Sequence, residues 1–390
     1  MRMHASGLTL VLALGGGWAA AQDPAPAAAP VPGETSLNVF NPTVSVFLNG
    51  LWRLDNKDVA HEHDGEIHEL DDRFLLRAAE LDFRAAVDPF ADAVLVVGAH
   101  KESPGEYEID VEEGYVVVKS LPLGFWEEPP LGTEIKAGRF LTSTGILNRL
   151  HEHDLPQSMR GLTFENFFGG HAYAADGVSL RFHLPSIGDS ALTLTTEAVQ
   201  GGGWKMGHDG ADQPAFIGHL GWFNTFADEH DLDLSLIGTY GSNDPDRRRQ
   251  TQLLSLDAFY RWRPLQGGQW TSLVLAGQLF YGSREWEDEA TFESGTNRAL
   301  GWLVYSQYQL DRQWYLGIRF DRTEHLEDRD TVSSRLNPYV SFYASEFFRI
   351  RAGYEQTWSD DDALDGLKTF LLEFNIVFGA HPPHPYWANF

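Results

Sequence analysis

Two short runs of the sequence alternate histidine with acidic residues, a pattern that suits a transition-metal site. The first run holds His61, His63 and His68, and the second consists of His151, Glu152, His153 and Asp154. Imidazole nitrogens and carboxylate oxygens are ligands of zinc and copper, and two histidines one residue apart can share a side of an extended chain. Such clusters are also common as plain polar surface. A divalent metal bound by the first run is therefore one interpretation, and a protein without any cofactor is the other.

Three arginines, Arg139, Arg149 and Arg160, surround the second run. A guanidinium pairs well with phosphate or carboxylate, so they could create a local anion site. The whole chain, however, has 56 acids against 29 Lys and Arg, and a formal net charge of -27. That charge favours cations and argues against nucleic acid as a partner. The sequence leaves the sign of any charge selectivity open.

The residue types needed for nucleophilic catalysis are present, but their spacing does not indicate a catalytic triad. Serine, histidine and aspartate all occur, yet no spacing singles out a nucleophile with its base and acid. Cysteine is absent, which excludes disulfides and thiolate metal ligands. We therefore expect that the protein is not an enzyme.

The N-terminal residues predict export. Basic residues precede an apolar run over 8–14, and three alanines ending at Ala21 provide a signal-peptidase site. We expect residues 1–21 to be a signal peptide and the Ala/Pro-rich residues 22–41 to be a periplasmic linker. No later segment approaches the roughly 18 consecutive apolar residues of a membrane helix, so any membrane span must be built from strands.

Short segments of alternating apolar and polar residues follow the linker. Leu81 and Phe83, for example, take one parity, while Glu80 and Asp82 take the other. This period of two predicts strands with one apolar and one polar face. Turn residues delimit such segments at 43–54, 74–87, 93–101, 107–121, 133–141, 177–184, 191–200, 216–226, 231–240, 252–263, 270–281, 298–310, 314–322, 335–345, 347–359 and 367–378. We expect an all-β fold, a transmembrane antiparallel barrel of about sixteen strands over 42–379.

Two further patterns place this barrel in a membrane. Short connections such as 186–189 alternate with long polar ones such as 201–214, as periplasmic turns alternate with external loops. Many of the 12 tryptophans lie near predicted strand ends, where membrane barrels carry aromatic girdles. A soluble sandwich would also have apolar strand faces, but it gives no reason for the alternation in loop length. The predicted location is the outer membrane of a Gram-negative cell.

The polar parity of each strand should then face the lumen. This rule turns ten charged residues inward: Glu80, Asp82, Arg84, Asp257, Arg261, Arg263, Arg319, Arg349, Arg351 and Glu355. Both signs of charge are represented. Such a lining suits hydrated ions and small polar solutes.

The alternation breaks between residues 140 and 175, in a stretch that is too long and too aromatic for a simple loop. We expect it to fold inward and narrow the pore, with an external loop packed on its neighbours as the alternative. The residues expected at the constriction are Arg139, Arg149, His151, Glu152, His153, Asp154 and Arg160. Charges at such a point would set selectivity.

The chain resembles the phosphate-selective porin superfamily in several motifs and in the order of its predicted strands across nearly the whole mature chain. The residues that carry the resemblance are Gly138-Arg139-Phe140 to Gly145, Asn148, His151, His153, Asp154 and Pro156, with the stretches 80–83 and 112–115. The resemblance implies a sixteen-stranded, often trimeric channel with an inward-folded loop. The best-studied members concentrate Lys and Arg along an anion path, and this acid-rich chain departs from that pattern.

We therefore expect an outer-membrane porin that allows passive diffusion of small ions or polar solutes. A zinc-related outer-membrane uptake channel and a non-conducting structural or adhesive barrel are the alternatives. The expected partners are outer-membrane lipid, these solutes, the barrel assembly machinery and further copies in a homotrimer. The terminal Phe390 resembles the residue that the assembly machinery recognises, although prolines prevent the tail, 380–390, from continuing a strand.

Overall fold

The computed structural model describes residues 42–380. Gaps remain at 59, 64–65, 70–73, 104–105, 202–213, 245–248, 266–269, 289–290 and 328–329, and the side chains of 59–73 and 102–106 are also not described. The chain divides after Asn38 into two units, and the described residues belong to the second. The predicted signal peptide and linker, and all of the predicted tail except Ala380, lie outside the described residues.

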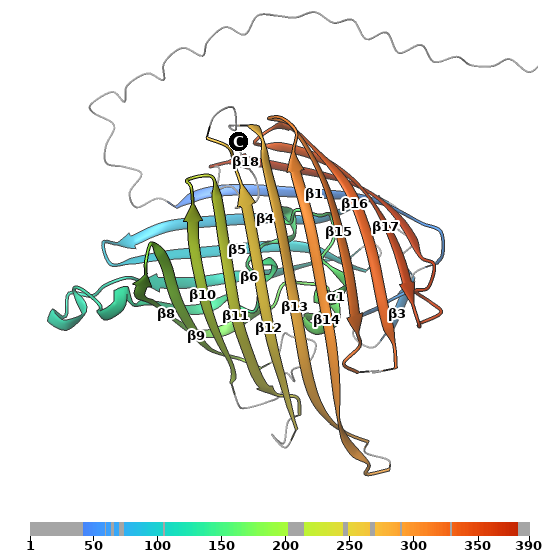
Figure 1. The fold of residues 1–390 in the computed structure, drawn as a ribbon, viewed down its shortest axis with the longest axis horizontal. Coiled ribbons are helices and arrows are strands. Elements are labelled where there is room, and N and C mark those ends of the chain that lie inside the picture. The colour runs from blue at the N-terminus through green and yellow to red at the C-terminus, as the bar shows by residue number, and fades with distance from the viewer. Residues whose placement is uncertain are drawn as a thin grey trace, which may run out of the picture. The chain divides into compact units, whose positions relative to one another are not determined.

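Sixteen antiparallel strands close into one barrel in the described part of the chain (Figure 1). They are β1 Thr43–Asp55, β4 Phe74–Asp88, β5 Ala91–Ser103, β6 Glu106–Val118, β7 Glu134–Leu141, β8 Ala174–Ile187, β9 Ser190–Val199, β10 Ala215–Phe226, β11 His230–Ser242, β12 Gln250–Trp262, β13 Ser272–Glu287, β14 Ser294–Gln309, β15 Trp314–Glu324, β16 Val332–Ser345, β17 Phe348–Ser359 and β18 Lys368–Gly379. Strand order follows the sequence, and β1 pairs with β18 to close the wall. This confirms the predicted fold class.

The alternation of residue types decides which way each side chain faces. In β18, Phe370 and Ile376 are about two-fifths exposed, whereas Glu373 is completely buried. The same division holds in β17, where Arg349 and Arg351 are buried. The barrel therefore has an apolar outer face and a charged inner face, the reverse of a soluble protein. This distribution is the one expected when hydrocarbon contacts the outer face.

Strands extend further than the sequence pattern indicated. The predicted loop 282–297 is mostly strand, because β13 continues to Glu287 and β14 begins at Ser294. A two-stranded hairpin, β2 Ala60–His63 and β3 Glu66–Glu69, occupies the first long connection. Cross-strand hydrogen bonds need no apolar face once the chain has left the membrane, so alternation underestimates strand length there.

One pair of connections departs from the alternation of short and long. β6 begins three residues after the end of β5, on the side of the long loops. The next connection, 119–133, lies on the side of the short turns and contains the 3₁₀ helices η1 Gly124–Trp126 and η2 Pro130–Gly132. Its apolar residues are exposed, with Phe125 at 78%.

The connection between β7 and β8, residues 142–173, is named the inner segment below. It contains η3 Leu147–Arg149, η4 Glu152–Asp154 and the seven-residue helix α1 Leu162–Phe168. Among the described residues, no helix has the length and apolar character needed to cross a membrane.

Candidate functional site

The inner segment leaves and re-enters the wall at one point. The Thr142 amide donates to the Tyr173 carbonyl at 3.0 Å, and the Asn148 amide nitrogen donates to the same carbonyl, also at 3.0 Å. Asn148 completes the closure by accepting a bond from the Tyr173 amide at 2.7 Å. All three side chains are completely buried. The segment is therefore a long excursion whose two ends are tied together.

Buried arginines on the inner wall hold the backbone of the segment. Arg319 on β15 donates to the Met159 carbonyl at 2.8 Å, and Arg349 on β17 donates to the His153 carbonyl at 2.8 Å. Arg351 donates to a further carbonyl of the segment. In a closed wall of sixteen strands, β15 lies eight strands from β7, halfway around. The inner segment leaves the wall at β7 and is hydrogen-bonded to β15, so it reaches across the interior to the opposite side of the wall.

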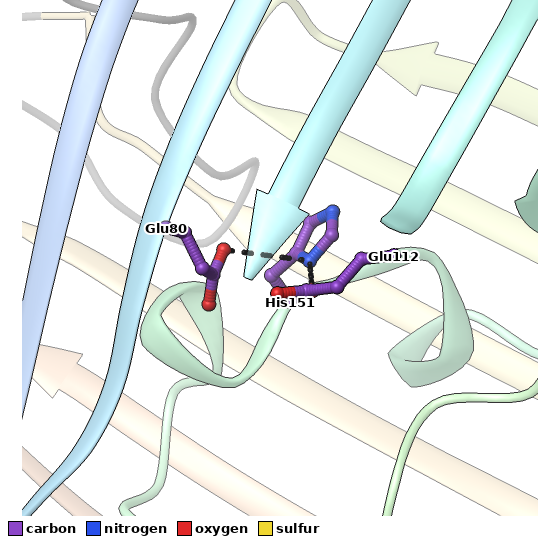
Figure 2. A group of neighbouring side chains, drawn as sticks. All are labelled: Glu80, Glu112 and His151. Atoms are coloured by element: carbon purple, nitrogen blue, oxygen red, sulfur yellow. Dashed lines mark hydrogen bonds and ion pairs between the residues drawn. The ribbon is translucent and has the colours of Figure 1, made fainter. Parts of the chain in front are cut away.

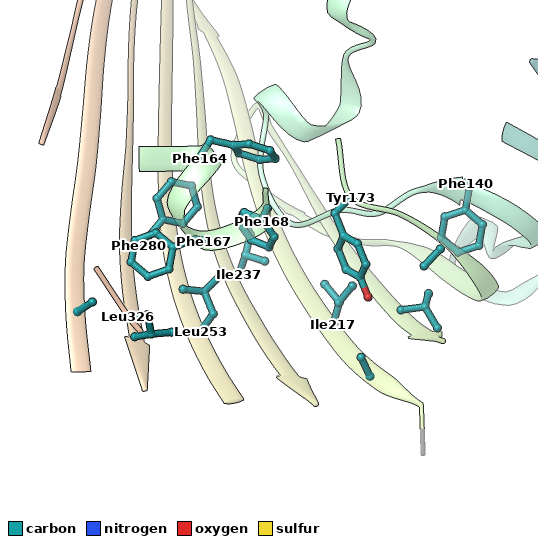
Figure 3. Close-up of a cluster of buried hydrophobic side chains, with 14 residues drawn as sticks. Phe140, Phe164, Phe167, Phe168, Tyr173, Ile217, Ile237, Leu253, Phe280 and Leu326 are labelled. Carbon is teal, nitrogen blue, oxygen red and sulfur yellow. The ribbon is translucent and has the colours of Figure 1, made fainter. Parts of the chain in front are cut away.

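Helix α1 packs its phenylalanines on an apolar area of the inner wall. Figure 3 shows Phe167 and Phe168 beside Phe280 and Ile237, and the rings of Phe167 and Phe280 are 5.6 Å apart. The wall makes room for this contact at Gly301, where a Cβ would lie 2.6 Å from the Phe167 ring. The apolar burial fixes α1 against β13 and β14.

Filling this space should displace the helix. We expect Gly301→Ala to destabilise the folded barrel by about 1–3 kcal/mol, because the added methyl overpacks a closed contact. The measurement is urea unfolding in lipid vesicles, and Gly238→Ala is the control, since nothing lies within 4 Å of its Cβ position. Equal stability of the two variants would show that α1 does not press on this part of the wall.

The second histidine run meets β4, β5 and β6 elsewhere on the wall. His151 Nδ1 lies 2.8 Å from Glu112 Oε2, and its Nε2 lies 2.9 Å from Glu113 Oε1. The other oxygen of Glu112 is 2.7 Å from His100 Nε2. Figure 2 shows that Glu80 also points toward His151. Imidazole and carboxylate groups from a loop and three strands thus converge.

A β-bulge explains how two adjacent glutamates contact the same imidazole. Along β6, Glu113 pairs with Val96 and Val111 pairs with Val97, so Glu112 is the extra residue. A bulge of this kind re-aims one side chain of a strand. Without it, the alternation would turn one of the two glutamates toward lipid.

Glu80, His100, Glu112 and His151 border a cavity of about 260 Å³. Its acids are Glu80, Asp110, Glu112 and Glu152, and its other charged or titratable residues are His100, Arg139, His151, Arg160 and His171. Burial lowers the pKa of His151, but hydrogen bonds with Glu112 and Glu113 outweigh it and raise this pKa well above its ordinary value. Burial also lowers the pKa of Arg160 to about 10. At neutral pH the guanidinium of Arg160 is therefore still positive.

The residues predicted at the constriction have different surroundings. Arg139, His151, Glu152 and Arg160 line the cavity. Arg160 is 4% exposed and donates to the carbonyls of residues 147 and 150, so it braces the segment itself. Arg149 lies instead 3.0 Å from His219 on β10.

His153 and Asp154 complete the predicted set. His153 stacks on Phe47 with 3.9 Å between ring centres, and its Nδ1 lies 3.1 Å from Glu80 Oε2. Asp154 lies 3.5 Å from the other nitrogen of His153.

The residues predicted to line the lumen divide into two groups. Seven are at most 6% exposed, and these are Glu80, Asp82, Asp257, Arg319, Arg349, Arg351 and Glu355. The side chains of Arg84, Arg261 and Arg263 are 42%, 21% and 44% exposed and pair with Asp82 or Asp231. Asp257 also accepts the Ile146 amide of the inner segment at 2.6 Å.

The first histidine run is described only in its backbone. His61 lies directly opposite His68 in the β2–β3 hairpin, and His63 lies opposite Glu66. Their side chains lie outside the described part, so a metal at these residues stays a prediction.

Comparison with known proteins gives one relative in sequence and several in fold. No family model matches the chain. It is 27% identical over 402 residues to an uncharacterized protein of Aquifex aeolicus (strain VF5), covering 90% of this chain and 81% of that protein. The fold is similar to an anion-selective porin from Comamonas acidovorans, with a TM-score of 0.56 at 10% identity over 86% of this chain and 99% of that one. It is also similar to the outer membrane channel DcaP of Acinetobacter baumannii, with a TM-score of 0.55 at 9% identity over 86% and 97% of the two chains. These likenesses show a shared barrel fold.

Proposed function

We propose that this chain is an outer-membrane porin through which small charged or polar solutes diffuse passively. The observation that carries the proposal is the closed sixteen-stranded wall, whose large apolar side chains are exposed and whose charged side chains are buried inside. A barrel of about sixteen strands is wide enough for an aqueous channel, and an apolar exterior is stable only in a bilayer.

The inner segment supplies the constriction in this proposal. It spans the interior and is fixed by buried arginines and by α1, so it reduces the cross-section open to water. Solutes pass the remaining opening by size, and the charged groups beside it filter them by sign. No step makes or breaks a covalent bond.

Membership of the phosphate-selective porin superfamily and assembly as a homotrimer are finer parts of the same proposal. They rest on the sequence resemblance. Phosphate itself is not the solute that we propose, because the chain has a formal net charge of -27 and the four acids of the cavity outnumber its two arginines. We propose a preference for small cations.

The charges at the cavity should set the reversal potential. In a planar bilayer with a KCl gradient, we expect Asp110→Asn with Glu152→Gln to reduce the cation preference, because the pair removes two negative charges. Arg139→Gln should increase the preference. Arg160 is left intact because it braces the segment.

The matched control is Arg263→Gln, since this side chain is 44% exposed and lies outside the cavity lining. Its reversal potential should equal that of the wild type. Reversal potentials that do not change in the cavity variants would place the filter elsewhere. A wild-type protein without any conductance would support the structural or adhesive alternative.

A further inference from the structure

Three potential metal-ligand atoms meet where the inner segment contacts β4 and β6. One ligand atom each of Glu80, Glu112 and His151 lies within 4.8 Å of the other two. His151 Nδ1 is 2.8 Å from Glu112 Oε2 and 3.7 Å from Glu80 Oε2 (Figure 2). In a tetrahedral zinc site with ligands about 2.0–2.1 Å from the ion, neighbouring ligand atoms are about 3.4 Å apart. The observed separations lie on both sides of that value.

Two of these ligands are oriented by a second partner. His151 Nε2 lies 2.9 Å from Glu113 Oε1, which directs Nδ1 toward the other two groups. Glu112 Oε1 lies 2.7 Å from His100 Nε2, which leaves Oε2 facing His151. Metal-bound histidines usually donate their second nitrogen to a carboxylate in this manner, and ligating carboxylates are themselves hydrogen-bonded. The cluster therefore has an outer layer of support as well as candidate ligands.

Glu80 brings a buried carboxylate to the same place. Its side chain is 2% exposed, and its Oε2 lies 3.7 Å from His151 Nδ1 and 3.1 Å from His153 Nδ1. Burial of a carboxylate is costly unless the group is paired. A divalent cation would pair Glu80 and Glu112 at once.

We infer that Glu80, Glu112 and His151 form a binding site for one divalent transition-metal cation, of which zinc fits best. One imidazole with two carboxylates suits zinc, whereas calcium and magnesium prefer an all-oxygen set. Three protein ligands leave a fourth position for water or for His153. The site differs from the predicted one at His61, His63 and His68. Metal binding does not require the lumen to conduct, so this inference can fail or hold independently of the proposed function.

Calorimetric titration of the refolded, untagged mature chain with zinc chloride tests the site. The wild type should bind one equivalent with the affinity of a specific site. Glu80→Gln and His151→Ala should each weaken binding more than about 100-fold. Glu113→Gln should weaken it by about 10–100-fold, because Glu113 only orients His151.

Two controls leave the ligands intact. His171→Ala removes an imidazole whose side chain is 75% exposed, and the triple change at His61, His63 and His68 to Ala removes the first histidine run. Both should bind zinc as the wild type does. Loss of zinc binding in the triple variant would overturn the inference. Wild-type affinity for zinc in Glu80→Gln and His151→Ala would also overturn it.

A measurement on the wild type alone covers the case in which the variants misfold. X-ray absorption at the zinc edge should show nitrogen and oxygen ligands at about 2.0–2.1 Å with one imidazole. A shell without imidazole would overturn the assignment of His151.

Discussion

Replacing residues 143–172 with an Asn-Gly turn should raise the single-channel conductance severalfold. The hydrogen bond between Thr142 and Tyr173 already joins the two ends of the segment, and Asn-Gly suits a two-residue hairpin turn. The deletion therefore removes the inner segment from the lumen without changing the path of β7 or β8. Current through a pore depends most strongly on its narrowest section, so removal of the proposed constriction should dominate the result. The measurement is single-channel current in planar bilayers.

A smaller deletion in another connection provides the control. Shortening the β17–β18 connection within residues 361–365 alters an exposed turn and should leave conductance unchanged. Both variants should retain a strand-type circular dichroism spectrum. Wild-type conductance in the deletion variant would show that the inner segment does not limit the flow of ions.

The second large effect is expected from Glu373→Ala on β18. Glu373 is completely buried and pairs with Arg351 at 2.8 Å, Arg349 at 3.1 Å and Arg77 at 3.4 Å. Removing one partner of a buried ion pair leaves uncompensated charge and costs about 3–5 kcal/mol of unfolding free energy. Since Arg349 and Arg351 also hold carbonyls of the inner segment, channel currents should become noisier.

Urea unfolding in lipid vesicles measures this loss. Asp92→Ala is the matched control, because it breaks an ion pair with Lys119 in which both side chains are about half exposed. Exposed pairs contribute little, so the control should stay within about 1 kcal/mol of the wild type. A similarly small loss of unfolding free energy in Glu373→Ala would mean that water solvates the three arginines in place of the glutamate.

The wall was predictable because one rule governs it throughout. A period of two is imposed wherever lipid contacts one face and water or polar groups contact the other, so all sixteen strands could be located from sequence, although the ends of several could not. The rule was wrong for Phe280 and Ile237, which have the inward parity although they are apolar. They face inward because α1 covers them. The sequence did contain a signal for this exception, because large apolar residues stand at positions that the alternation assigns to the lumen.

The site was less predictable than the wall because it depends on contacts between distant residues. His151 and His153 were identified from their spacing, but Glu112, Glu113 and His100 were not predicted as their partners. Two adjacent acids in an alternating strand were the signal for the bulge at Glu112. The role of Arg160 could not be predicted, since its acceptors are backbone carbonyls brought close only by the fold of the segment.

The pairing of β1 with β18 constrains the order in which the protein can mature. The seam joins the first and last strands of the barrel, and the Ala380 amide bonds to the Val44 carbonyl at 2.8 Å. Arg349, which donates to the His153 carbonyl, lies 196 residues after His153 in the sequence. Neither contact can exist until β17 and β18 have been synthesised and have reached the barrel. A truncation before β18 should thus leave an unpaired, aggregation-prone edge instead of a smaller pore.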